Sequence, residues 1–164
     1  VNEWIPLFNG ENTDGWRGYN SDAMPLGWDV VDGILTFKND QSSEEDYNYD
    51  RGQKNIIYAL EEFDNFELYV EWKISKGGNS GIFWGVQEGK SIRNPYLTAP
   101  EIQIIDNDRH PDAKEKLKFH QAGAVYDLVE PSKDVCKPAG QWNHVILTID
   151  HNKHTMSNIL WFYF

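Results

Sequence analysis

The sequence lacks several features that would define its class directly. Cys136 is the only cysteine in 164 residues, which excludes an intramolecular disulfide and a thiolate metal cluster. No apolar run is long enough to cross a membrane as a helix, and the first residues carry no signal-peptide pattern. Basic residues are scarce as well, with 15 Lys and Arg against 26 Asp and Glu, for a net charge of −11. That charge repels phosphate backbones and anionic lipids, so nucleic acid and membrane surfaces are disfavoured as partners.

Two common catalytic motifs are also absent. Residues 78–81 read Gly-Asn-Ser-Gly, which is not the G-x-S-x-G elbow of a serine hydrolase. The five histidines show neither H-E-x-x-H nor a Cys-paired zinc spacing. Cys136 stands in a Lys- and Pro-containing loop without a C-x-x-C partner, which predicts a half-buried loop residue rather than a catalytic thiol.

Aromatic residues are abundant: 7 Trp, 8 Tyr and 8 Phe make up 14% of the chain. Buried aromatics fill the cores of sandwiches, and exposed ones stack on sugar rings or bases. The length fits one domain spanning residues 1–164, with enough chain to bury a sizeable core.

Period-two alternation dominates the pattern of apolar residues. In residues 66–74, "FELYVEWKI", apolar and polar side chains alternate, which predicts a strand with one buried face. Residues 28–37 read as a hairpin around an Asp32-Gly33 turn. The only helical pattern is the short "PDAKEKLK". We therefore predict an all-β sandwich, with further strands at residues 55–60, 81–86, 101–105, 123–128 and 144–150.

The densest group of catalytic residue types lies in "APEIQIIDNDRHPD". On a regular strand Glu101 and Gln103 share one face, and a bulge near Ile105 would bring Asp106 onto it. Two carboxylates beside an amide are typical of glycosidase clefts. Spacing alone favours the alternative, a solvated outer face of an amphipathic strand. The acidic residues after this strand could also hold calcium, but the segment lacks an EF-hand's glycine and terminal Glu, so a plain turn is favoured.

Two other segments supply candidates for a cleft. Glycines surround Ser80 and Trp84, and Trp84 would be either a sugar platform on the open face beside Glu101 or an ordinary core residue. In "KFHQAGAVYDL", His120 precedes an expected strand and titrates near neutral pH, which suits proton transfer, although such a histidine is more often a surface residue.

Taken in order, six segments resemble the 3-keto-disaccharide hydrolase family: "PLFNGENTDGWRGY", "GWDVVDGILTF", "NSGIFWG", "PEIQIIDN", "HQAGAVYDL" and "KPAGQWNHVILTI". The resemblance implies a concanavalin A-like jelly-roll β-sandwich of two antiparallel sheets. It also implies a periplasmic or extracellular protein that acts on carbohydrate, with a cleft on the concave sheet. Members of the family act on glycosides whose ring carries a 3-keto group, by acid/base elimination and hydration or by hydrolysis.

The resemblance and the strand geometry together give the candidate site. We expect catalytic roles for Glu101, Asp106 and His120, and substrate contacts from Ser80, Trp84, Gln103 and Tyr126. The elimination route needs a base, an acid, and a donor or metal that holds the enolate. No motif predicts a metal or other cofactor, so a divalent ion such as calcium has no support from spacing. The alternative function is a non-catalytic carbohydrate-binding module on the same sandwich, and a third is a structural interaction domain.

The end of the chain departs from the family pattern. Members continue after the "GQWN" strand through a hairpin and a closing strand, whereas here residues 150–164 read "DHNKHTMSNILWFYF". We expect either a C-terminal truncation or a tail that replaces the missing strands. Such a tail would pack in the sandwich or against a second chain, giving self-association.

Overall fold

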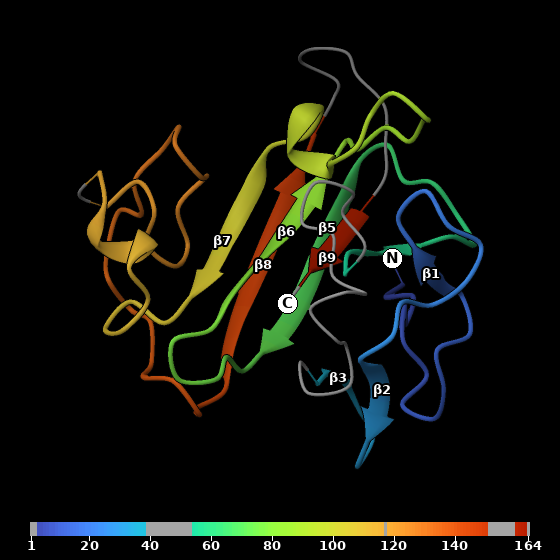
Figure 1. The fold of residues 1–164 in the computed structure, drawn as a ribbon, viewed down its shortest axis with the longest axis horizontal. Coiled ribbons are helices and arrows are strands. Elements are labelled where there is room, and N and C mark those ends of the chain that lie inside the picture. The colour runs from blue at the N-terminus through green and yellow to red at the C-terminus, as the bar shows by residue number, and fades with distance from the viewer. Residues whose placement is uncertain (1–2, 39–53, 117, 151–159, 164) are drawn as a thin grey trace.

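An antiparallel five-stranded sheet organises the fold (Figure 1). The computed structural model describes residues 3–38, 54–116, 118–150 and 160–163. Across the sheet the strand order is β1 (Trp16–Gly18), β4 (Ile56–Tyr58), β9 (Leu160–Tyr163), β6 (Asn79–Trp84) and β7 (Glu101–Ile105). Short strands of this kind follow from the period-two pattern of the sequence, which places alternate side chains on opposite faces.

Two smaller antiparallel pairs complete the strands. β5 (Phe66–Trp72) pairs with β8 (Asn143–Ile149) along its whole length. The predicted alternation of β5 is confirmed, because Leu68 and Trp72 are buried while Glu67, Tyr69 and Glu71 are exposed. β2 (Trp28–Val31) and β3 (Ile34–Phe37) form the predicted hairpin. Asp32 and Gly33 have φ values of +52° and +75°, as a two-residue turn of this hand requires.

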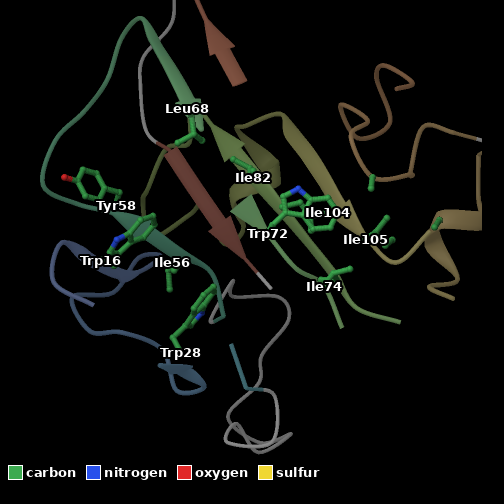
Figure 2. Close-up of a cluster of buried hydrophobic side chains, with 12 residues drawn as sticks. Trp16, Trp28, Ile56, Tyr58, Leu68, Trp72, Ile74, Ile82, Ile104 and Ile105 are labelled. Carbon is green, nitrogen blue, oxygen red and sulfur yellow. The ribbon is translucent and has the colours of Figure 1, made fainter. Parts of the chain in front are cut away.

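The main hydrophobic core lies between the five-stranded sheet and the β5–β8 pair. Ile82 and Ile104 project from β6 and β7 into one buried cluster with Leu68 and Trp72 of β5 (Figure 2). Trp28 joins this cluster from the hairpin and donates its indole N–H to the Lys54 carbonyl oxygen at 2.7 Å. The described residues therefore form the all-β sandwich of antiparallel sheets that the sequence predicts.

The apolar tail packs within the sheet. β9 lies between β4 and β6 and pairs antiparallel with both, with Phe162 opposite Ile56 on one side and opposite Ile82 on the other. The sequence predicted that a tail replacing the missing strands would pack either in the sandwich or against a second chain. The pairing of β9 with β4 and β6 is the first of these arrangements. Both backbone edges of this strand are used inside the sheet, so the structure gives no support to self-association through it.

Two local predictions were wrong. Residues 123–128 form turns with isolated bridges at Val125, not a strand, because Gly123 and Asp127 have positive φ values of +86° and +60°. The helical candidate is reduced to a single 3₁₀ turn, η4 (Asp112–Lys114), and a second such turn, η3 (Pro95–Leu97), was not predicted. Within the described residues, no helix has the length and apolar character needed to span a bilayer.

Candidate active site

The outer face of β6 and β7 is the face turned away from β5 and β8. In the register of these two strands Phe83 is opposite Glu101, and Gly81 is opposite Gln103. Residues directly opposite each other in an antiparallel pair project to the same side. Ile82 and Ile104 project to the other side, into the core. Glu101 and Gln103 therefore share the outer face, as predicted from their spacing.

Gly81 leaves the space that the Glu101 side chain occupies. A Cβ atom built on Gly81 would lie 2.6 Å from Cδ and 2.7 Å from Cγ of Glu101, so the carboxyl group lies directly over this glycine. Glu101 is 7% exposed and Gln103 1% exposed. The alternative of a solvated strand face is therefore wrong at these two positions, since a buried carboxylate is rare without a specific role or partner.

The segment after His120 continues this face beyond β7. The Tyr126 N–H donates to the Glu101 carbonyl oxygen at 2.9 Å, and the Gln103 N–H donates to Ala124 at 3.0 Å. Val125 bridges to Ile102, whose side chain projects toward the core side. Tyr126 consequently projects on the same side as Glu101.

A hydrogen-bonded group, here called the His120 network, is formed by Asp112, His120, Tyr126 and Asp127. His120 is 4% exposed; its Nδ1 lies 2.8 Å from Asp112 Oδ1 and its Nε2 2.9 Å from Asp127 Oδ1. The Tyr126 hydroxyl lies 3.2 Å from each carboxylate oxygen of Asp112. The Tyr126 ring stacks on the imidazole with a centroid separation of 4.2 Å. His120 and Tyr126, two of the residues expected in the candidate site, are therefore in direct contact.

The charges around this network favour the protonated forms of His120 and Tyr126 and the ionised form of Asp127. Burial alone would lower the pKa of His120, but hydrogen bonds to Asp127 and Asp112 outweigh it and raise the pKa. Burial and the neighbouring carboxylates of Asp112, Asp127 and Glu101 raise the pKa of Tyr126 far above its ordinary value. The Lys116 ammonium, 2.7 Å away, and His120 lower the pKa of Asp127. The network is thus arranged to hold protons beside Glu101.

Glu101, Gln103, Asp112 and Tyr126 all line one extended cavity, whose lining also includes residues of β5 and of the β2–β3 hairpin. Tyr96, in η3, also lines it and is 56% exposed. The loop that leads to η3 is fixed to β1 by a bidentate pair, in which Arg17 donates to both Glu88 carboxylate oxygens at 2.7 Å. The cavity therefore has the Tyr126 segment and the η3 loop in its wall.

Asp106 does not join this face. The register of β6 and β7 is regular up to Ile105, so the expected bulge is absent and alternation sends Asp106 to the opposite side from Glu101. Its carboxylate accepts the N–H groups of Gly77 at 2.8 Å and Asp108 at 3.1 Å. Burial would raise the pKa of Asp106, but these donors and Arg109 lower it. The residue stabilises a turn, and its expected catalytic placement was wrong.

Ser80 and Trp84 also project away from Glu101. Both alternate with Gly81 and Phe83 along β6, and Ser80 is opposite Ile104 in the register. Ser80 is fully buried on the core side. Phe83, not Trp84, is opposite Glu101, so the expected tryptophan platform beside Glu101 is not formed. Both errors have one cause: the prediction put Ser80 and Trp84 on the Glu101 face of β6, whereas alternation along the strand puts Gly81 and Phe83 there.

A metal ion is not the simplest occupant of the site. Asp112, Glu115 and His120 each bring one ligand atom within 4.8 Å of the others. Both ring nitrogens of His120 are already hydrogen-bonded to carboxylates, however, so a bound cation would have to replace one of these bonds. The turn aspartates considered for calcium do not converge, since Asp106 accepts backbone N–H groups while Asp112 contacts His120.

Sequence reasoning missed Asp112 and Asp127 as partners of His120. Each stands in a turn, Asp112 eight residues before His120 and Asp127 seven residues after it. Asp112, His120 and Asp127 come together only because of the path of the irregular loop that connects them. Their spacing in the sequence therefore indicated no more than acidic residues near a histidine. Cys136 is half-buried as predicted, and burial with nearby aspartates raises the pKa of its thiol to about 11.

Known proteins of two kinds resemble this chain. A 3-keto-disaccharide hydrolase of Bacteroides thetaiotaomicron is 42% identical over 149 residues, which are 85% of this chain and 50% of that protein, so the chain spans about half the length of this relative. Two crystal structures of candidate glycosyl hydrolases from Parabacteroides distasonis share the fold. One has a TM-score of 0.78 at 23% identity, covering 96% of this chain and 85% of the other. The second has a TM-score of 0.65 at 26% identity, covering 90% and 63%.

The family model for the 3-keto-alpha-glucoside-1,2-lyase-like domain matches residues 3–159. That range contains β1 to β8 and all the residues of the outer face and of the His120 network. The chain therefore belongs to the 3-keto-alpha-glucoside-1,2-lyase-like family.

Proposed function

We propose that this protein cleaves glycosides whose ring carries a 3-keto group, by elimination followed by addition of water. The observation that carries the proposal is the placement of a buried carboxylate, Glu101, on one sheet face with the proton-holding His120 network. The name of the Bacteroides relative, a 3-keto-disaccharide hydrolase, supports the same substrate class. A periplasmic or extracellular location, which the family resemblance implies, is part of this proposal.

The chemistry follows from the ketone. A C3 carbonyl acidifies the hydrogen on C2, so a base removes that proton and the electron pair forms an enolate. The enolate expels the glycosidic oxygen from C1, which leaves as an alcohol after taking a proton, and a C1–C2 double bond forms. Water then adds its hydroxyl to C1 and a proton to C2. The sum is hydrolysis of the glycoside to a 3-keto sugar and an alcohol.

The outer face offers one residue for each role. Glu101 is the base that removes the C2 proton, because it is the carboxylate that lies over Gly81 on the cavity-lining face. Tyr126 is the proton donor to the leaving oxygen: its hydroxyl lines the same cavity as Glu101, and the hydrogen that it now donates to Asp112 passes to the leaving oxygen. The Gln103 side-chain Nε2 carries two hydrogens, one of which donates to the developing enolate oxygen. His120 is a positioning residue that holds Asp112 and Tyr126 in place.

A binding module would not need this arrangement. Burying the Glu101 carboxylate and, in the same site, an imidazole paired with two carboxylates costs free energy that a purely binding surface could avoid. Catalysis explains the cost, because a base and an acid must both be held at the reacting atoms.

Replacing Glu101 by Gln tests the proposal. With methyl 3-keto-α-glucoside as substrate, we expect kcat to fall by about 100-fold or more, as the loss of a general base does, while the melting temperature changes little. Glu61→Gln, at an exposed position outside the cavity lining, is the matched control and should keep full activity. In D₂O the wild-type product should carry deuterium at C2. Sugar binding without any product would instead support the carbohydrate-binding module, and full activity of Glu101→Gln would remove the assigned base.

A further inference from the structure

Two amide side chains on the outer face keep buried polar atoms unpartnered. Within the described residues, Asn79 Oδ1 and Gln103 Nε2 are buried and have no hydrogen-bond partner. The other end of the Gln103 amide is used, since its Oε1 accepts the Ile104 N–H at 3.1 Å. Buried amide atoms are nearly always hydrogen-bonded in folded proteins, and one left unpaired destabilises the fold. These two atoms therefore require an explanation.

The two amides lie around the carboxyl group of Glu101. Gln103 is opposite Gly81 in the register, and Asn79 precedes Gly81 on the same face of β6. Glu101 covers the space above Gly81. Both Asn79 and Gln103 line the same cavity as Glu101. An unpaired acceptor, an unpaired donor and a carboxylate thus lie on one strand face, at register positions next to Gly81.

We propose that Asn79 and Gln103 together recognise one hydroxyl of the sugar bound against Glu101. A hydroxyl group both donates and accepts, so it donates to Asn79 Oδ1 and accepts from Gln103 Nε2. A single substrate group then pairs both atoms that the free protein leaves unpaired. This inference rests on the proposed function for its substrate class, and it adds Asn79 as a residue that determines specificity.

The neutral character of the pair fits a neutral sugar. A carboxylate or lysine in place of either amide would put a further charge beside Glu101 and change its ability to take a proton. Ser80 provides the contrast: its Oγ is equally buried and unpartnered, yet it projects from the opposite face of the same strand and does not line the cavity.

The test compares the hydroxyl requirements of three proteins: wild type, Asn79→Ala and, as matched control, Ser80→Ala. The probes are methyl 3-keto-α-glucoside and its 2-, 4- and 6-deoxy analogues, with kcat/KM as the readout. In the wild type we expect one deoxy analogue to be at least about tenfold poorer than the parent, because a site built to bond a hydroxyl rejects a ligand that lacks it. In Asn79→Ala that penalty should shrink to less than about threefold. Ser80→Ala should keep the wild-type pattern.

Thermal stability separates recognition from a structural role. Removing an unpartnered buried amide should leave the melting temperature of Asn79→Ala equal to or above that of the wild type. A lower melting temperature with unchanged deoxy penalties would mean that Asn79 supports the fold and would overturn the inference. Equal penalties in the wild type and Asn79→Ala would overturn it as well.

The failure of the proposed function gives a different result. If the wild type turns over none of the keto sugars, the proposed function fails, and the same comparison is made by titration calorimetry with methyl α-glucoside and its 2-, 3-, 4- and 6-deoxy analogues. A deoxy penalty on affinity that disappears in Asn79→Ala would uphold the recognition site. The absence of any such difference would overturn it.

Discussion

Gly81→Ala is the sharpest perturbation that the site allows. The added methyl group would lie 2.6 Å from Cδ and 2.7 Å from Cγ of Glu101, distances that no folded protein tolerates between carbon atoms. The backbone does not oppose the change, because Gly81 lies in a regular strand and is not among the residues with positive φ. The Glu101 side chain must therefore move, and with it the proposed base.

The effects on stability and on activity should differ greatly. Crowding a packed site costs about 1–3 kcal/mol, while replacing glycine by alanine at a compatible position returns about 0.4–1 kcal/mol through the unfolded state. The net loss in the free energy of unfolding is then between about 0 and 3 kcal/mol. Activity should fall further, because a displacement of about 1 Å at a reacting group costs on the order of 100-fold in rate.

Urea denaturation and kcat/KM on methyl 3-keto-α-glucoside measure the two effects. Gly89→Ala is the matched control: its Cβ would make only ordinary contacts of 3.7–3.8 Å with Ile92, so both quantities should stay near wild type. Activity of Gly81→Ala within about threefold of wild type, in a folded protein, would show that the position of Glu101 over Gly81 does not matter for turnover.

Two further predictions concern the His120 network. Tyr126→Phe keeps the ring that stacks on His120 but deletes the proposed donor, so kcat should fall by about 100-fold or more with little change in KM; a kcat equal to wild type would exclude Tyr126 as the acid. The pKa of His120 is higher in the folded protein than its unfolded value of about 6.5. Its contribution to stability is therefore complete below about pH 6.5 and is lost as the pH rises through the folded pKa. Urea unfolding between about pH 6 and 9 should show this decline in the wild type and a flatter profile in His120→Asn; parallel profiles would contradict the assignment.

The sequence predicts strands well where alternation is long or a turn is distinctive. The β2–β3 hairpin and β7 have the predicted bounds, because Asp-Gly specifies the turn and "EIQII" has one apolar and one polar face. β1 and β9 were not predicted as strands, since three or four residues give too little pattern to separate a strand from a loop. Their pairing partners are distant in sequence, and only the assembled sheet identifies them.

The same contrast, between regular strands and irregular segments, applies to the residues of the candidate site. Glu101 and Gln103 could be assigned to one face because residues two positions apart on a strand project to the same side of the sheet. Asp106 and Trp84 failed because each assignment depended on a phase or a bulge that spacing leaves undetermined. The bonds of His120 to Asp112 and Asp127 depend on an irregular loop, for which residue order gives no geometry.

The central position of β9 has a consequence for how the protein folds. Its residues pair with β4, roughly 100 positions earlier in the chain, and with β6, roughly 80 earlier. Contacts of such high sequence separation form late and slow folding, since the intervening chain must first be ordered. Until β9 docks, β4 and β6 each present an open backbone edge, and β6 carries Gly81 and Asn79. Productive folding and assembly of the Glu101 site are therefore expected to be the same late event, with the risk of edge-to-edge aggregation concentrated before it.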